Sequence, residues 1–277
     1  MQHTHISAKQ GLFDLKLREL WQYRDLVWLF TRRSFIVTYT QTILGPLWLI
    51  INPLLTGITY VVLFGNIAKL STDGVPQLLF YLSGHAIWSF FSGCVVKNAS
   101  TFADNAYLFG KVYFPRLVIP VSNVLGNAIL FLIQMLLVFA LLLWYSFQGL
   151  VHPLWSIWIL LPFLLLLLGV MGMGTGLIIS SLTTKYRDLR VLLDFGMTLW
   201  MYATPVVYPL SAVDVSLRRY ILINPVSPVI ELFRHILFGV GDVSSASLAY
   251  SFFFTVAAAL AGIVIFNHVE RTFMDTV

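Results

Sequence analysis

The sequence predicts an all-α integral membrane protein with six transmembrane helices. Hydrophobic residues make up 58% of the chain and charged residues only 10%, whereas a soluble domain carries about 25% charged residues. Apolar stretches of the length that crosses a bilayer recur along the chain. Lysine and arginine are also divided unequally between the loops, as in multi-pass membrane proteins. A soluble fold could not cover this much apolar surface, whereas lipid tolerates it.

Six segments are predicted to span the membrane. They are residues 47–64, 78–96, 117–145, 154–182, 191–207 and 248–266. The third and fourth are long enough to tilt or to extend beyond the hydrocarbon. The fifth is short and ends near Pro205, so its ends are the least sharply marked.

The basic residues predict the orientation of the chain. With the N-terminus inside, 13 of the 17 lysines and arginines lie on the cytoplasmic side, and the other four are Lys69, Arg218, Arg219 and Arg234. This bias predicts cytoplasmic N- and C-termini. It also accounts for the formal net charge of +5 without a nucleic-acid partner, because the basic residues flank apolar segments.

An amphipathic interface helix is predicted at residues 11–33, before the first span. Phe13, Leu17, Leu20 and Trp21 recur at helical spacing among charged residues. A helix with one apolar and one charged face fits the cytoplasmic membrane interface. A soluble helix packed against a partner fits the same pattern equally well, and the two readings are compatible.

Re-entrant helices are predicted before the last span. In residues 225–239, an apolar stripe contains Val226, Val229, Phe233 and Ile236, with prolines nearby at 205, 209, 225 and 228. The stretch is too short to span a membrane. Broken backbone at membrane depth must be buried in protein or line a wet cavity, so a re-entrant segment is favoured over a helix lying on the surface.

No catalytic machinery is visible in the sequence. It lacks a P-loop, an HExxH zinc motif and a GxSxG elbow, and its six histidines are scattered. We therefore predict no catalytic residues, no metal site and no bound cofactor. Few ionisable groups lie in the spans, which argues against an ion-driven pump. Gly172 and Gly176 form a small-xxx-small pair, which fits either packing within the chain or a dimer seam.

Several strings, taken in order, resemble the type-2 ABC exporter permeases that move O-antigen, capsular polysaccharide or teichoic acid. The resemblance covers the chain from Trp21 to the C-terminus. The strings are Arg32-Arg33-Ser34, Leu44-Gly45-Pro46-Leu47-Trp48, Asn52-Pro53-Leu54, Lys111-Val112-Tyr113-Phe114-Pro115-Arg116, Tyr186-Arg187-Asp188-Leu189, Ala203-Thr204-Pro205-Val206-Val207-Tyr208-Pro209 and Asn224-Pro225.

The resemblance implies a single permease domain over residues 1–277, with a six-span region at 47–266, in the bacterial cytoplasmic (inner) membrane. It implies two permease copies and two copies of a separate ATPase subunit that binds ATP and Mg. A lipid-linked glycan would be the substrate, and membrane lipids the surroundings. An exporter of a drug or small lipid is one alternative. A secondary transporter or channel without an ATPase is the other.

The resemblance also places a first coupling helix within residues 98–110 and a second cytoplasmic contact near residues 186–189. Apolar side chains would seat in an ATPase groove with charged ones at its rim, although an ordinary solvated loop helix remains the alternative. The predicted coupling residues are Phe102, Asp104, Leu108, Phe109, Lys111, Tyr186, Arg187 and Asp188.

The predicted gate and pathway combine the short helix at 225–239 with aromatic residues from the spans. Aromatic rings stack on the apolar faces of sugars, although most aromatics of such a chain belong to the interfacial belts. The predicted gate and pathway residues are Trp48, Tyr60, Trp88, Tyr202, Pro225, Glu231, Phe233 and Arg234.

Overall fold

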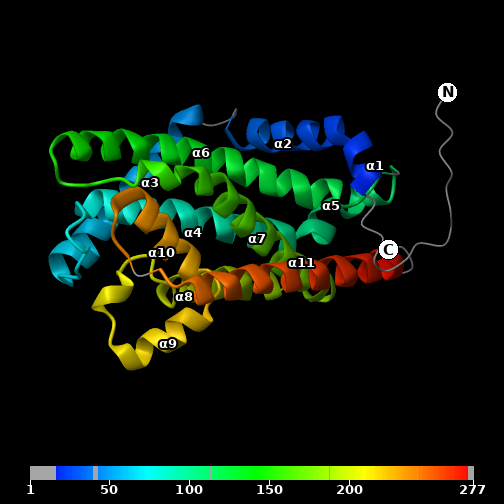
Figure 1. The fold of residues 1–277 in the computed structure, drawn as a ribbon. Helices are drawn as coiled ribbons and strands as arrows, with labels where there is room; N and C mark the ends of the chain where they lie inside the picture. Colours follow the sequence, from blue (N-terminus) through cyan, green and yellow to red (C-terminus); the bar gives the residue numbers. More distant parts are fainter. Residues whose placement is uncertain (1–16, 40–42, 113, 187, 242, 274–277) are drawn as a thin grey trace.

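The computed structural model describes residues 17–39, 43–112, 114–186, 188–241 and 243–273. These residues form helices and turns that pack into an elongated bundle (Figure 1). The α-helices are α1 (Leu17–Gln22), α2 (Arg24–Tyr39), α3 (Trp48–Tyr60), α4 (Gln77–Ala99), α5 (Thr101–Phe109), α6 (Val118–Phe147), α7 (Leu161–Lys185), α8 (Leu189–Tyr202), α9 (Val215–Ile223), α10 (Ser227–Phe238) and α11 (Ser245–Phe273). The shorter helical turns are η1 (Gly45–Leu47), η2 (Val61–Ile67), η3 (Trp155–Leu160) and η4 (Leu210–Ala212).

Within the described ranges, five helical segments are long and apolar enough to cross a membrane. They are Gly45–Ile67, Gln77–Ala99, Val118–Phe147, Trp155–Thr183 and Ser245–Val269. They correspond to the first four predicted spans and the last one, so these five predictions are confirmed. In Figure 1, α1, α5 and the C-terminal end of α11 lie at one end of the bundle, which we call the cytoplasmic end after the predicted orientation. We call the opposite end the outer end.

The predicted fifth span, residues 191–207, is not a continuous helix. α8 has 14 residues, or about 21 Å at 1.5 Å per residue, which is less than the hydrocarbon thickness. The helix ends at Tyr202, shortly before Pro205, which has no N–H to donate and disfavours helix before it. The chain nevertheless runs the length of the bundle, as two contacts show. Arg190 pairs with Asp104 of α5 at the cytoplasmic end, and the Val206 carbonyl lies beside Gly84 in the outer part of α4. A short helix with a non-helical extension thus makes this passage.

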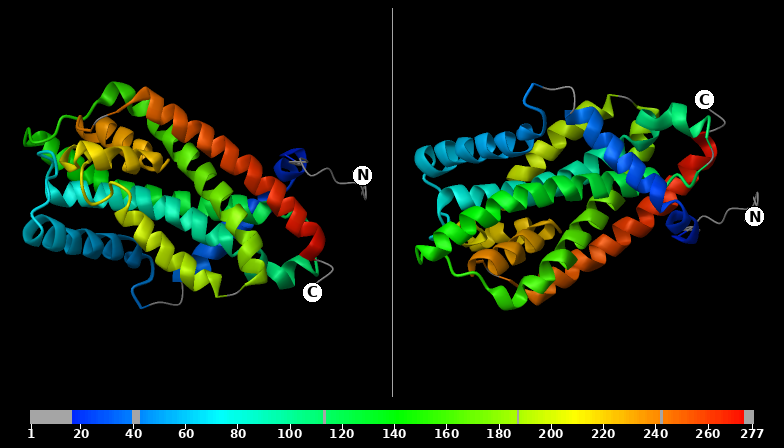
Figure 2. Two further views of the ribbon diagram at one scale, coloured as in Figure 1. Left: turned by 90° about the horizontal axis from the view of Figure 1, so that it is seen from below. Right: turned by 90° about the horizontal axis from the view of Figure 1, so that it is seen from above.

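The predicted interface helix is formed by α1 and α2, and its first residues, 11–16, lie outside the described ranges. α2 packs on α6 and crosses it obliquely (Figure 2, right). Thr31 is buried between them, and its Oγ1 donates to the Val27 carbonyl at 2.9 Å and contacts the Ser122 carbonyl at 3.4 Å. The opposite face exposes Trp28 and Ile36. One face packed on the bundle and one exposed apolar face suit a helix at the membrane interface.

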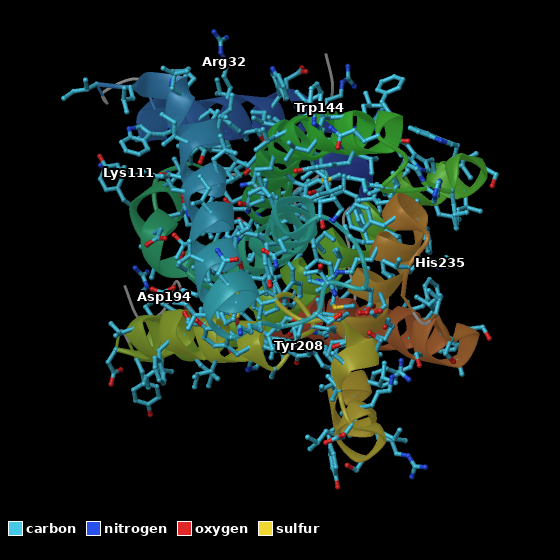
Figure 3. The ribbon with its side chains drawn as sticks, turned by 90° about the vertical axis from the view of Figure 1, so that its left-hand side faces the viewer. Arg32, Lys111, Trp144, Asp194, Tyr208 and His235 are labelled. Carbon is cyan, nitrogen blue, oxygen red and sulfur yellow. The ribbon has the colours of Figure 1, made fainter. Side chains whose placement is uncertain are left out.

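The helices α9 and α10 form a sharply bent pair before the last span. The bend between them is 105°. Ten of the twelve residues of α10 are buried, whereas α9 projects from the bundle (Figures 1 and 3). The burial of α10 among the long helices agrees with the predicted re-entrant segment and rules out a helix lying on the surface.

Glycines on α7 allow the central helices to pack closely. A Cβ on Gly172 would lie 2.7 Å from the Cβ of Cys94 on α4, and one on Gly176 would lie 2.6 Å from the Val95 carbonyl oxygen. A Cβ on Gly174, which faces the other way, would lie 2.7 Å from the Ala258 backbone of α11. The pair Gly172 and Gly176 therefore serves packing within the chain rather than a dimer seam.

Candidate gate and coupling site

A buried arginine organises the outer end of the bundle. Arg234 on α10 is 1% exposed. Its Nη2 donates to the Val206 carbonyl at 2.7 Å, and its Nη1 lies 3.3 Å from the Tyr208 carbonyl and 3.4 Å from Oε1 of Glu231. Its Cζ stands 3.9 Å from the centre of the Phe80 ring. We call Phe80, Val206, Tyr208, Glu231 and Arg234 the outer cluster.

The buried charge of Arg234 is compensated by the other members of the outer cluster. A buried charge is costly unless it is paired and hydrogen-bonded, and here one guanidinium neutralises Glu231 and satisfies two backbone carbonyls. Gly84 of α4 makes this approach possible, because a Cβ there would lie 2.6 Å from the Val206 oxygen and 3.2 Å from Nη2 of Arg234. The cluster thereby joins α4, α10 and the segment that follows α8.

One contact between two tyrosines and one between two loops extend the outer cluster toward the surface. The Tyr208 hydroxyl donates to the Tyr202 carbonyl at 3.2 Å. Burial raises the pKa of the Tyr208 phenol, and the nearby Arg234 lowers it by less, so the phenol stays a neutral donor. In the adjoining loops, the Ser211 hydroxyl donates to Asp73 at 2.6 Å, which ties the turn before α4 to η4.

Four of the eight predicted gate and pathway residues lie together. Pro225, Glu231, Phe233 and Arg234 are all buried on or beside α10. The Pro225 carbonyl accepts a hydrogen bond from Ser251 of α11 at 2.8 Å. The Phe233 and Phe131 rings are 6.1 Å apart, edge to face, so α10 reaches the middle of α6.

The other four predicted gate and pathway residues do not join them. Trp48 is half-buried at the start of α3, and Tyr60, near its other end, points its hydroxyl at the sulfur of Met201, 3.4 Å away. Tyr202 is half-exposed. Trp88 was predicted to face the pathway, but its side chain is 5% exposed and packs against Phe91 and Trp200. Its ring therefore belongs to the hydrophobic core.

A short helix, α5, lies where the first coupling helix was predicted, but its aromatic residues point inward. Phe102 stacks on Phe266 of α11 with ring centres 4.5 Å apart, and Phe109 packs between Phe102 and Phe114. Both are buried. The prediction that Phe102 and Phe109 seat in an ATPase groove is therefore wrong, because these rings hold α5 onto the bundle. Leu108 is partly buried against the same cluster.

The outward side of α5 and the turn after it carry a different set of residues, which we call the cytoplasmic surface: Asp104, Tyr107, Lys111 and Val112. Tyr107 is 74% exposed. The Lys111 ammonium hydrogen-bonds the Tyr107 hydroxyl and lies 3.8 Å from its ring centre. Figure 3 shows Lys111 beside α5, at the side of the bundle. Asp104 and Lys111 were predicted here, whereas Tyr107 and Val112 were not.

The second predicted cytoplasmic contact lies next to the first. Arg190, at the start of α8, pairs with Asp104 of α5 at 2.9 Å, and both side chains are partly exposed. The Thr183 hydroxyl donates to the Ala99 carbonyl, which joins the ends of α7 and α4. Tyr186 and Asp188 are exposed beside this junction, and Arg187 lies outside the described residues.

Arg190 and Asp73 are among the residues of these sites that the sequence analysis missed. Arg190 entered only as one of the cytoplasmic basic residues, because a contact with Asp104 across the bundle leaves no local pattern. Asp73 lay in an outer loop without any motif. A signal did exist for the polar pair Asn123 and Asn127, which stand one helical turn apart inside an apolar span, where unpaired polar groups are costly; the Nδ2 of Asn127 donates to the Asn123 carbonyl at 2.9 Å.

Comparison with known proteins agrees with the resemblance to permeases that the sequence showed. A protein named O-antigen export system permease protein RfbA, from Myxococcus xanthus, is 31% identical over 226 residues, which cover 80% of this chain and 84% of that protein. Two proteins of the same name from Klebsiella pneumoniae are 28% and 26% identical, each over 91% of this chain and 94% of its own length. Residues 25–238 match the family described as ABC-2 type transporter. The chain is therefore a multi-pass membrane protein that belongs to the ABC-2 type transporter family.

Proposed function

We propose that this chain is the membrane subunit of an ABC exporter that moves a lipid-linked polysaccharide of the O-antigen or capsule type across the bacterial cytoplasmic membrane. The observation that carries the proposal is the match to three O-antigen export permeases over 84–94% of their lengths. Teichoic acid, a polyol polymer, is the neighbouring substrate class. Both termini would lie in the cytoplasm, as the basic residues of the sequence predict.

Energy would come from a separate ATPase subunit that binds ATP and Mg. The sequence has no P-loop, so the chain itself has no motif to cradle nucleotide phosphates. In this proposal two copies of the chain pair with each other and with two ATPase subunits. The exposed apolar side chains of α8, among them Val191, Phe195 and Leu199, support a second copy as one of its neighbours.

The contacts in the chain provide a route from the ATPase to the outer gate. An ATPase that presses on the cytoplasmic surface moves α5, and the Asp104–Arg190 pair passes the motion to the start of α8. The segment after α8 ends in the Val206 and Tyr208 carbonyls, which hold Arg234 of α10. A displacement of α8 along its axis would therefore shift α10, the proposed gate.

Transport by the reconstituted protein tests this function. The chain is co-purified with the ATPase subunit proposed as its partner and placed in proteoliposomes that contain lipid-linked polysaccharide. We expect polymer to reach the opposite leaflet only with ATP, as detected by its accessibility to an added glycosidase. A chain that recruits no ATPase and still moves substrate would instead be a secondary transporter or channel. ATP-driven transport of a drug or a small lipid, with no movement of polymer, would favour the other alternative.

A further inference from the structure

A cleft with polar and apolar walls runs along α2 and α6, away from the outer cluster; α4 closes one part of it, and Asn105 of α5 lines the other. It consists of two cavities of about 440 and 280 Å³, and Ser34 of α2 lines both. Lys97 of α4 lines the larger cavity and Arg33 of α2 the smaller. We call the two cavities together the α2–α4–α6 cleft.

The described lining of the cleft contains basic side chains and no aspartate or glutamate. Among the described residues, Lys97 and Arg33 make no ion pair, and the other polar residues of the lining, such as Ser92 and Asn127, are neutral. A partly desolvated cation near the hydrocarbon is costly unless an anion compensates it.

Lys97 does not behave as a simple interfacial lysine. A lysine two residues before the end of a span ordinarily extends its ammonium into water. Lys97 instead is half-buried and faces the larger cavity. Its backbone carbonyl accepts a hydrogen bond from Asn123 of α6 at 3.3 Å, which holds this part of α4 against α6 and keeps the lysine stem in the cleft.

Two glycines shape the larger cavity. A Cβ on Gly126 of α6 would meet no atom within 4 Å, so that position opens onto free space. A Cβ on Gly93 of α4 would lie 2.7 Å from the amide oxygen of Asn127, so only glycine lets the amide sit there. Phe35, Val96 and Leu130 supply an apolar wall beside the polar groups.

We propose that the α2–α4–α6 cleft binds the phosphate group of an anionic lipid. Lys97 and Arg33 supply the charge, and Asn127, which gives one amide hydrogen to the Asn123 carbonyl, supplies its other amide hydrogen. The lipid chain follows the wall of Phe35, Val96 and Leu130. A polyprenyl phosphate carrier and a membrane phospholipid share this chemistry. Binding needs no ATPase, so the site can be tested apart from the proposed export function.

Binding by the purified full-length chain in a neutral detergent tests the site. Native mass spectrometry counts bound polyprenyl phosphate in one series and phosphatidylglycerol in another, and sodium phosphate is added as a competitor in each. We expect saturable binding of at least one lipid, and the tighter of the two identifies the source of the phosphate. Lys97→Gln should weaken this binding about tenfold or more, because a charge-assisted contact is lost, and Lys97→Arg should retain it.

A pair of glycine variants separates the cavity from general effects on the membrane helices. Gly126→Leu fills the larger cavity and should abolish lipid binding. Gly196→Leu on α8 is the matched control, because a Cβ there also meets no atom within 4 Å, and it should bind as the parent does. Should Gly126→Leu aggregate on gel filtration, the Lys97→Gln and Lys97→Arg pair decides. Undiminished binding by Lys97→Gln, or displacement of the lipid by sodium phosphate at equal concentration, would overturn the proposal.

Discussion

The groups that contact Arg234 belong to two different elements, so the contacts have different effects on the position of α10. Glu231 lies one turn earlier on α10 itself, so the ion pair neutralises the helix but does not fasten it. The Val206 and Tyr208 carbonyls belong to the segment after α8, so those hydrogen bonds fix α10 to its neighbour. Arg234 therefore makes contact with a buried carboxylate and with two backbone carbonyls at once.

Substitution of the two charged residues of α10 should therefore have unequal effects. Arg234→Met should lower stability by ~3–5 kcal/mol, because it removes the buried cation that neutralises Glu231 and binds the Val206 and Tyr208 carbonyls. Glu231→Gln should cost less, because the guanidinium keeps both carbonyls. Thermal unfolding of the two variants in detergent measures the order. A Glu231→Gln loss as large as the Arg234→Met loss would contradict this division of roles.

At the level of single residues, the sequence identified the charged residues of the site but not the groups that they contact. Glu231 and Arg234 stood out because charged residues interrupt an apolar stripe. Their carbonyl partners at Val206 and Tyr208 could not be predicted, because every residue has a carbonyl and only the fold selects one. Phe102 and Phe109 were placed outward because aromatic residues in a loop helix suggest a docking surface. The burial of Phe102 depends on Phe266, which is far away in the sequence.

At the level of elements, the division of α5 into two faces sharpens the test of coupling. Tyr107→Asp should abolish stimulation of the partner ATPase while the unfolding temperature stays close to that of the parent, because the side chain is largely exposed. Phe102→Ala should instead destabilise the chain by ~3–5 kcal/mol, since it removes a buried ring. ATPase rate and thermal unfolding are measured on the same preparations. Normal stimulation by Tyr107→Asp would remove this face of α5 from the coupling role.

The five long spans were predictable from the sequence, whereas the path of α8 was not. Hydropathy located Gly45–Ile67, Gln77–Ala99, Val118–Phe147, Trp155–Thr183 and Ser245–Val269, because a span needs about 20 apolar residues whatever its neighbours are. α8 is too short for that rule, and its non-helical extension is held by side chains of α10 and by Gly84 of α4. Its path therefore depends on tertiary contacts that a single-segment pattern does not contain.

At the scale of the whole molecule, the Asp104–Arg190 pair should matter for transmission and hardly at all for stability. Both side chains are partly exposed, so the pair is expected to contribute ~0.2–1 kcal/mol. Asp104→Asn and Arg190→Gln should each uncouple ATP hydrolysis from transport, and the double variant should be no worse than either single one, because all three break one link. Proteoliposome transport per ATP hydrolysed measures this ratio. Additive losses would show that the two residues act separately.

The orientation of the whole bundle can be tested at its two ends. In a Cys94→Ala background, which removes the single cysteine of the chain, Ser216→Cys on α9 should react with a membrane-impermeant maleimide in spheroplasts. Asp188→Cys before α8 should react only after the membrane is opened. Both positions are exposed, so a difference in labelling reports sidedness rather than burial. α8 and its extension connect the two ends, because Arg190 contacts α5 while Val206 contacts Arg234. The reverse labelling pattern would place the proposed gate in the cytoplasm and overturn the N-inside orientation; labelling of both positions from outside would mean that residues 188–216 do not cross the membrane.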